Sequence, residues 1–282
     1  MQLISTVEDL RTARRGLTGK AGFVPTMGAL HQGHASLVRQ SVAENDLTFV
    51  SIFVNPTQFG PNEDLDKYPR TFEADVALLE SLGVDFLFAP NVADIYPKGE
   101  AQISFQIRDL DKVLCGASRP GHMNGVVQVV SILFHLVQPD KAYFGQKDYQ
   151  QFLILKTMAT ELHMPVQVVP CPIVREPDGL AMSSRNRYLG REEREQALFL
   201  SRLIQAIQQQ RGQWTSLAQI QEFAAAELSQ YPLVRLDYLE VLDGRSLKPL
   251  HDLSPESHPH IFVAAFLGTT RLIDNAPLWN DR

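Results

Sequence analysis

The chain is poor in cysteine and has no long apolar run. Only Cys115 and Cys171 occur in 282 residues, far apart in sequence, which excludes a disulfide-stapled framework. The first ten residues mix acidic and apolar side chains and do not form a signal-peptide pattern, so we expect a cytoplasmic protein. The longest apolar stretch, residues 126–137, is interrupted by polar side chains, and we therefore expect no membrane partner.

An excess of positive charge is also missing. The net charge is −6, with 44% hydrophobic and 21% charged residues, which is ordinary for a soluble globular protein. Proteins that bind nucleic acids usually carry a broad basic face, so we expect no nucleic-acid partner, although a small basic pocket remains compatible with this charge. The length of 282 residues is sufficient for two domains.

Several common catalytic signatures are absent from the sequence. It contains no Walker A loop, no G-x-G-x-x-G fingerprint and no G-x-S-x-G nucleophile elbow, and neither cysteine stands in a nucleophile motif. Any phosphate or acyl chemistry must therefore depend on other residues.

Apolar strands alternate with helical patterns through the first part of the chain. This alternation predicts an α/β fold with a Rossmann-like parallel sheet and helices on both faces, whose ligands bind at the carboxyl ends of the strands. We expect strands at residues 21–24, 47–54, 85–88, 141–144 and 166–169, and helices at 33–43, 71–82, 125–137 and 148–162.

The pattern changes near residue 174. We expect a long helix at 192–210, a second helix at 217–228, and strands at 235–242 and 260–266. The sequence thus predicts a larger domain of residues 1–173 and a smaller α+β C-terminal domain of residues 174–282. Loops between domains often carry ligand sites, so we expect the loop at 175–187 to be a candidate ligand-binding segment.

The turn at residues 25–34 is the most informative segment. It follows an apolar strand, contains Gly28 and Gly33, and leads directly into a helix. The first N–H groups of a helix lack intrahelical partners and carry partial positive charge, so this arrangement favours an anion such as phosphate. His31 and His34 add hydrogen-bond donors. Two histidines three residues apart are also half of a metal site, but no nearby carboxylate or cysteine completes it, and the sequence identifies no metal ligands.

Amide and basic side chains follow two other expected strands. Asn55 and Gln58 come after the strand at 47–54 and suit a hydroxyl or carboxylate, although Asn55 also suits a simple turn cap. Lys147 follows the strand at 141–144, and Gln151 lies one turn further along. A capping Asp148 explains the helix start there but gives no reason for the lysine.

Two loops carry an arginine that can grip an anion through two parallel hydrogen bonds. Arg119 lies between glycines in the loop 116–121, and Arg185 follows two serines in the loop 182–186. Solvent-exposed loops are the simpler explanation for either segment alone.

Taken in order, these segments resemble one known family. The motifs P-T-M-G-A-L-H-x-G-H, F-V-N-P-T-Q-F-G-P-N-E-D, R-P-G-H, F-G-Q-K-D-Y-Q-Q and M-S-S-R-N are similar to those of the pantoate–β-alanine ligases, which belong to the HxGH nucleotidyltransferase superfamily. The resemblance implies an AMP-forming ligase that uses ATP, with Mg²⁺, to convert pantoate to pantoyl adenylate. β-Alanine then displaces AMP to give pantothenate. It also implies a homodimer.

The resemblance assigns roles to individual residues. It makes His34 the proton donor and adds His31, Lys147 and Arg185 to the catalytic set. Gln58 and Gln151 would bind pantoate, with Gln58 also near β-alanine, and Arg119 would be a neighbour of the carboxylate substrates. The implied ATP-binding residues are Met27, Gly28, Ala29, Leu30, His31, Gln32, Gly33, His34, Gly145, Gln146, Lys147, Asp148, Val174, Met182, Ser183, Ser184 and Arg185. Closure of the loop 182–186 over the adenylate would exclude water.

Two other functions remain open at this point. A related nucleotidyltransferase would share the histidines and Arg185 but would not need Gln58 and Gln151. A synthetase-like tRNA-binding module would need a basic face, which the composition does not favour.

Overall fold

The computed structural model describes residues 1–61, 63–99 and 101–279. The chain divides into two compact units, Met1–Pro172 and Ile173–Arg282. The functions expected of the two domains remain predictions, and each unit is described below by itself.

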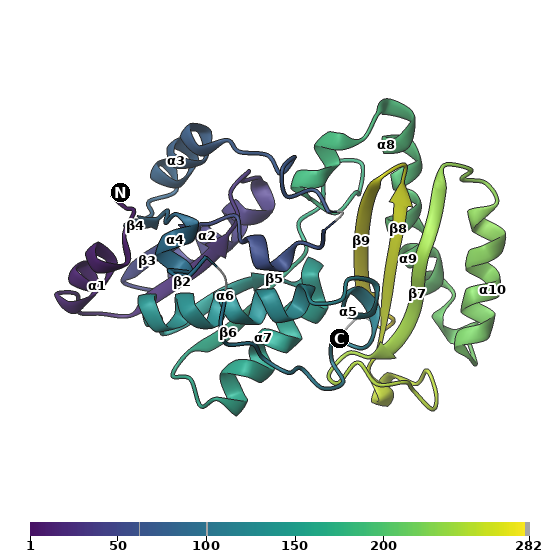
Figure 1. Cartoon of the computed structure of the whole chain (residues 1–282). Coiled ribbons are helices and arrows are strands. Elements are labelled where there is room, and N and C mark those ends of the chain that lie inside the picture. Colours follow the sequence, from purple (N-terminus) through teal and green to yellow (C-terminus); the bar gives the residue numbers. More distant parts are fainter. Residues whose placement is uncertain (62, 100, 280–282) are drawn as a thin grey trace. The chain divides into compact units, whose positions relative to one another are not determined.

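The first unit is built on a six-stranded sheet with the order β1-β4-β3-β2-β5-β6 (Figure 1). Every pairing in it is parallel. The strands are β1 (Gln2–Ile4), β2 (Ala21–Thr26), β3 (Leu47–Ile52), β4 (Phe86–Phe88), β5 (Lys141–Gly145) and β6 (Gln167–Cys171). The short β1 was not expected from the sequence.

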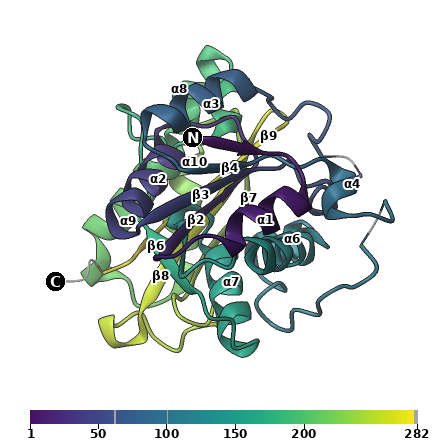
Figure 2. The same ribbon diagram turned by 90° about the vertical axis from the view of Figure 1, so that its left-hand side faces the viewer.

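Helices cover both faces of this sheet (Figure 2). On one face lie α2 (Gln32–Glu44) and α3 (Phe72–Ser81); on the other lie α1 (Val7–Arg15), α6 (His122–Val137) and α7 (Tyr149–Glu161). Two short helices, α4 (Val92–Ile95) and α5 (Leu114–Ser118), lie in the connections. The predicted parallel α/β fold is confirmed.

Strands and helices of the first unit are held by apolar side chains. Phe23 and Val24 of β2 and Phe49 and Val50 of β3 are fully buried because the sheet is covered on both faces. Helix α6 packs against the sheet, α1 and α7, which explains why it is apolar on nearly all sides.

The second unit combines helices with a three-stranded antiparallel sheet in the order β7-β8-β9. Its strands are β7 (Val234–Asp243), β8 (Pro259–Leu267) and β9 (Thr270–Pro277), and its helices are α8 (Arg191–Ala197), α9 (Phe199–Gln209) and α10 (Leu217–Leu228). The last strand was not predicted, because its charged and amide side chains obscure the alternation of a strand.

The prediction of one continuous helix over 192–210 is wrong. Helix α8 ends at Ala197 and α9 begins at Phe199. All four residues from 197 to 200 are buried, so the break lies in the apolar core of the second unit, where the sequence carries no glycine or proline to mark it. Among the helices of the described ranges, none has the length and apolar character to cross a membrane.

Candidate active site

Three predicted segments meet at the carboxyl edge of the first sheet. β2 pairs with both β3 and β5, so the turn after β2 lies between the short helices η1 (Pro56–Gln58) and η2 (Gln146–Asp148). A direct contact joins two of these segments, because Nε2 of Gln58 donates to the Met27 sulfur at 3.2 Å. The grouping of residues 27–34, Gln58 and Lys147 at one edge follows from the parallel topology.

The turn after β2 needs an unusual backbone. Gly28 has φ +81° and Ala29 has φ +50°, both in the left-handed region. A side chain on Gly28 would also come within 3.1 Å of Asp75 and of Ile52. Glycine is therefore required at position 28 for conformation as well as for space.

A carboxylate from α3 holds this turn. Asp75, only 3% exposed, accepts hydrogen bonds from the backbone N–H groups of Ala29 at 2.9 Å and Leu30 at 2.8 Å. The backbone amides of Ala29 and Leu30, in the turn before the helix, are thus bonded within the protein. Sequence reasoning missed Asp75, although a carboxylate four residues before the buried Leu79, on the same helix face, was a usable signal.

The two histidines cap helix α2 and orient each other. Nδ1 of His31 accepts from the N–H of Gly33 at 3.1 Å, and Nδ1 of His34 accepts from the N–H of His31 at 3.3 Å. The ring centroids lie 4.1 Å apart. Because Nδ1 acts as an acceptor in both rings, the proton of each neutral imidazole is on Nε2, and each ring presents an N–H donor there.

Burial keeps His34 uncharged at neutral pH. Desolvation, the adjacent His31 and the Lys147 ammonium together lower the pKa of His34 to about 3, while Asp148 opposes them. His34 is therefore a hydrogen-bond donor in this structure and does not contribute a positive charge.

Helix η2 brings a lysine toward the histidines. Nζ of Lys147 lies 3.5 Å from Oδ1 of Asp148, and the charges of both side chains influence His34. Asp148 also acts on His122, at the start of α6. Gln151 lies partly buried in the first turn of α7, directly after this segment. The charged side chains that act on His34 thus lie in η2, directly after β5.

Gln58 is held with its amide in a defined orientation. Nδ2 of Asn55 donates to Oε1 of Gln58 at 3.1 Å, so the NH₂ group of Gln58 points away from Asn55 and toward Met27. Asn55 is itself 1% exposed and accepts from the Tyr96 hydroxyl at 2.8 Å. Its Oδ1 also accepts from the N–H of Thr57, so the simple capping role is present as well. Sequence reasoning did not identify Tyr96.

Arg119 is not a solvent-exposed loop side chain. Its Nε and NH2 donate to the two carboxylate oxygens of Glu63 at 2.7 and 2.5 Å, and the arginine side chain is 15% exposed. The anion that this arginine grips in the structure is therefore a carboxylate of the protein.

The remaining predicted residues lie in the second unit. The N–H of Met182 donates to the carbonyl of Val174 at 3.0 Å, which closes a small hairpin. Ser183 caps the short helix η3 (Ser184–Tyr188) by accepting from the N–H of Arg185 at 3.3 Å, and Ser184 is buried. Val174 and Met182 are thus neighbours within the second unit, and their place in an ATP site stays a prediction.

Ion pairs fasten the first strand and the turn of this hairpin within the second unit. Arg194 of α8 bonds Glu176 at 2.8 Å and Asp178 at 2.7 Å, and Glu176 in turn accepts from Asn186. Arg175 forms a two-point pair with the buried Asp274 of β9. The residues that lead into 182–185 are therefore anchored to α8 and β9, and Asn186, which follows the segment, is tied to them through Glu176.

With this geometry in place, sequence comparison identifies the family. Residues 2–277 match the profile described as pantoate–β-alanine ligase. The chain belongs to the pantoate–β-alanine ligase family. The resemblance and the enzyme class expected from the motifs are confirmed.

Individual relatives agree with the ligase family assignment. A crystal structure of pantothenate synthetase from Thermus thermophilus has a TM-score of 0.92 and 46% identity, covering 99% of this chain and 100% of that one. A Francisella tularensis pantoate–β-alanine ligase, solved with beta-gamma ATP and β-alanine, has a TM-score of 0.81 and 34% identity over 99% and 98% of the two chains.

A bifunctional pantoate ligase/cytidylate kinase from Thermosynechococcus vestitus is 50% identical over 264 residues. The match covers 91% of this chain and 50% of that protein, so the ligase chain spans about half of this relative's length.

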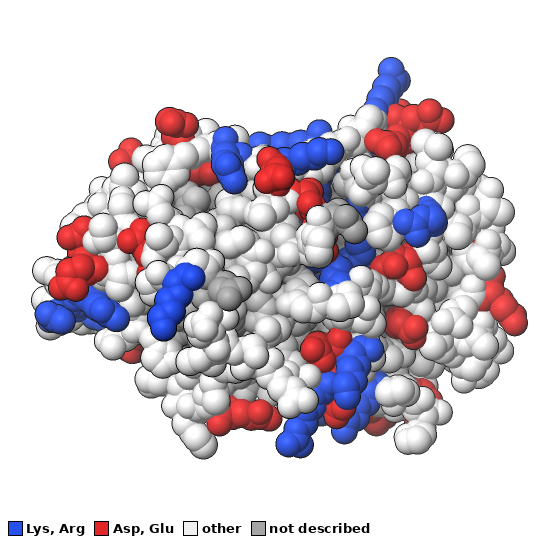
Figure 3. Space-filling view, viewed as in Figure 1, with Lys and Arg blue, Asp and Glu red and all other residues white. Residues whose placement is uncertain are grey.

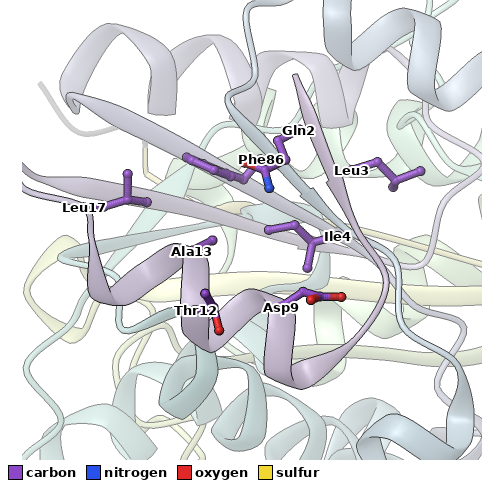
Figure 4. A pocket seen from close by; sticks show the side chains of 8 residues that line it. All are labelled: Gln2, Leu3, Ile4, Asp9, Thr12, Ala13, Leu17 and Phe86. Atoms are coloured by element: carbon purple, nitrogen blue, oxygen red, sulfur yellow. The ribbon is translucent and has the colours of Figure 1, made fainter.

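Two surface features of this ligase lie outside the candidate site. A hollow of about 310 Å³ lies between β1 and α1, lined by residues such as Leu3, Asp9 and Phe86, and it shares no residue with the predicted site (Figure 4). On the face drawn in Figure 3, acidic and basic side chains are interspersed over the described residues. Neither feature resembles the edge described above.

No protein-built metal site is evident in the ligase. Within residues 1–61, 63–99 and 101–279, no group of three or more histidine, cysteine or acidic side chains is arranged to hold a metal ion. The Nδ1 atoms of His31 and His34 are already engaged with backbone N–H groups. The residues present therefore do not fit a dedicated magnesium cage.

Proposed function

We propose that this chain condenses pantoate with β-alanine in two ATP-dependent steps at the carboxyl edge of the first sheet. The observation that carries the proposal is the contact between Gln58 and Met27, which places an amide suited to a small hydroxy acid beside the histidine-bearing turn. Family membership supports the overall reaction. The Francisella relative solved with beta-gamma ATP and β-alanine supports ATP as the nucleotide.

In the first step, a pantoate carboxylate oxygen attacks the α-phosphorus of ATP. The O–P bond to pantoate forms and the bond to pyrophosphate breaks, which gives pantoyl adenylate. We propose that the Nε2–H groups of His31 and His34 donate hydrogen bonds to phosphate oxygens. The Lys147 ammonium supplies positive charge, and Arg185 is a second proposed source on its motif alone.

Orientation of pantoate is assigned to two glutamines. Gln58 offers its NH₂ group, which suits a hydroxyl or carboxylate oxygen, because the bond from Asn55 to Oε1 orients the amide with its NH₂ toward Met27. Gln151, in the first turn of α7, is the second proposed contact. Such neutral groups position the attacking oxygen without adding charge.

In the second step, the β-alanine nitrogen attacks the carbonyl carbon of the adenylate. The new C–N bond replaces the C–O bond to AMP, AMP leaves with the electron pair, and the amine loses a proton. No enzyme nucleophile is required for either step. Gln58 is the residue that we propose to lie nearest β-alanine.

The ATP site also includes residues with backbone or turn roles. In the first unit these are Met27, Gly28, Ala29, Leu30, Gln32, Gly33, Gly145, Gln146 and Asp148. In the second unit, Val174 and residues 182–185 are proposed to complete the site, on the resemblance of their motif. Ion pairs to Arg194 and Asp274 hold the hairpin that leads into this segment within the second unit.

Three further features belong to the proposal. Mg²⁺ enters bound to the triphosphate of ATP, since the described residues supply no cage for it. The enzyme acts in the cytoplasm, in accord with its two separated, buried cysteines. It is a homodimer, as its motif resemblance implies.

One assay tests the function. The purified chain is mixed with MgATP and pantoate, with or without β-alanine, and pyrophosphate, AMP and pantothenate are measured. We expect pyrophosphate only when pantoate is present, and AMP with pantothenate only after β-alanine is added. Absence of pantoate-dependent pyrophosphate release from the folded protein would reject the ligase mechanism.

A further inference from the structure

We propose that His122 is a positioning residue that fixes Gln58, and that Arg119 and Glu63 hold His122 in the tautomer that does so. This inference rests on the proposed role of Gln58 in binding pantoate and β-alanine. It assigns a function to the R-P-G-H segment, which the proposed chemistry otherwise leaves without one.

The hydrogen bonds define the protonation of both ring nitrogens of His122. Nδ1 lies 2.8 Å from the backbone carbonyl oxygen of Gln58, which only accepts, so Nδ1 carries the proton. Nε2 lies 2.9 Å from NH1 of Arg119, which only donates, so Nε2 is the acceptor. The ring is therefore the neutral Nδ1–H tautomer, with one nitrogen committed to Gln58.

Glu63 orients Arg119 so that it can hold this tautomer. Its carboxylate binds Nε and NH2 of the guanidinium, which leaves NH1 directed at the imidazole. Bidentate pairs of this kind fix direction as well as distance. Burial and the Arg119 charge lower the pKa of His122 to about 4, against the opposing charges of Glu63 and Asp148. Burial and the Arg119 charge outweigh the two carboxylates, so the imidazole is neutral at pH 7.

Gln58 is held independently through its backbone and its side chain. His122 fixes the backbone carbonyl, and Asn55 fixes the side-chain Oε1. Helix α6 approaches the same segment closely at Gly125, where an added Cβ would lie 2.8 Å from Cα of Gln58. His122 and Gly125 lie three residues apart on α6 and therefore on one face of the helix. The Gln58 amide is thus oriented by Asn55 at Oε1 and by the Met27 sulfur at Nε2, with one N–H of its NH₂ not used in either bond.

Direct binding of a substrate carboxylate by Arg119 is the competing interpretation. It would have to use the second N–H of NH1, because Glu63 accepts from Nε and NH2, one N–H of NH1 faces His122, and NH2 also donates to the Gln58 carbonyl at 3.5 Å. The two interpretations differ in which substitutions at His122 restore activity.

Two amide substitutions at His122 distinguish the role of Nδ1 from that of Nε2. In His122→Asn the amide nitrogen replaces Nδ1 and keeps the donor to Gln58, whereas in His122→Gln it replaces Nε2 and loses that donor. We expect His122→Ala and His122→Gln to raise KM for pantoate and β-alanine about tenfold, the usual effect of one lost hydrogen bond, with KM for ATP unchanged. His122→Asn should recover most of this loss. Equal impairment of all three variants, or an equal rise in KM for ATP, would overturn the proposal.

A double-mutant cycle tests whether the effect passes through Gln58. If it does, His122→Ala should add less than twofold to the KM for pantoate in a Gln58→Ala background, because the group to be positioned is gone. If the two substitutions instead multiply each other's rise in KM for pantoate, the proposal is overturned, and direct substrate binding by Arg119 and His122 is favoured.

A spectroscopic measurement tests the arrangement of Glu63, Arg119, His122 and Gln58, which we call the clamp, independently of the proposed function. In ¹⁵N spectra of the wild-type histidines at pH 6, we expect an Nδ1-protonated neutral ring that disappears in His122→Asn. If the wild type releases no pyrophosphate with pantoate, the function fails, but this signal still tests the clamp. Its absence from the wild type would overturn the clamp whatever the activity.

Discussion

The backbone N–H of His31 donates a hydrogen bond to Nδ1 of His34 at 3.3 Å. This bond places the proton of the neutral His34 ring on Nε2 and aligns the ring within the first turn of α2. The histidine that the sequence predicted as a hydrogen-bond donor to phosphate is an oriented neutral donor in the structure.

His34→Ala should slow pantoate-dependent pyrophosphate release by roughly a hundredfold, the usual cost of removing one donor to developing charge. His34→Gln, whose amide nitrogen replaces Nε2, should retain more activity than His34→Asn. Thermal unfolding of each variant provides the control, because the substitutions should change folding far less than turnover. Wild-type turnover in the alanine variant would remove His34 from the mechanism.

Stability should fall as the pH is lowered from about 6.5. Burial lowers the pKa of His34 to about 3 and of His122 and His260 to about 4. Near pH 5 the unfolded chain therefore binds protons that the folded chain does not, so folding weakens on acidification, by about 1.4 kcal/mol per pH unit for each histidine fully within this window.

Carboxylates with lowered pKa act at more acidic pH. The pKa of Glu44 is lowered to about 2 by its hydrogen bond from Lys141, so its contribution is lost only below about pH 4.5. Urea denaturation at pH 7.0, 6.0 and 5.0 thus isolates the histidines. His260→Gln should reduce the slope of the unfolding free energy against pH. A free energy of unfolding that does not change between pH 7.0 and 5.0 would contradict the role assigned to the histidines.

Asp75→Asn should distort the turn before His31. An amide cannot accept from both Ala29 and Leu30 as the carboxylate does, and one unsatisfied buried N–H costs about 1–3 kcal/mol. We expect lower stability and a raised KM for ATP. Glu73→Gln, an exposed position on the same helix, removes the same charge and serves as the control. Identical behaviour of the two variants would show that the turn does not depend on Asp75.

Arg194→Met should loosen the hairpin that carries Ser183 and Arg185. Loss of its pairs with Glu176 and Asp178 should speed tryptic cleavage after Arg185 and Arg187 and raise KM for ATP. Arg191→Met removes an exposed i,i+4 pair from the same helix and should have little effect.

The same proteolysis experiment, repeated with substrates, tests whether the segment 182–186 closes over the adenylate. Addition of ATP with pantoate should protect the segment 182–187 in the wild type and less so in Arg194→Met. Equal cleavage with and without these ligands would argue against closure over the adenylate.

The sequence by itself determined the elements of the first sheet and the order of the motifs. Apolar strands such as 21–24 and 141–144 and the glycine-bearing turn are local patterns, and parallel topology then brings their carboxyl ends together. The family resemblance also depended only on residue order. For these reasons the α/β fold and the ligase class could be predicted before any contact was known.

Only the tertiary structure decided which polar groups hold the site. Asp75 lies 46 residues from Ala29, Glu63 lies 56 from Arg119, and His122 lies 64 from Gln58. No local periodicity encodes such bonds, because a buried hydrogen bond depends on where distant segments pack. The break between α8 and α9 is likewise absent from the helical pattern of the sequence and appears only in the structure. The motif residues could thus be read in order along the chain, while the groups that orient Gln58 and the histidines became visible only in the folded structure.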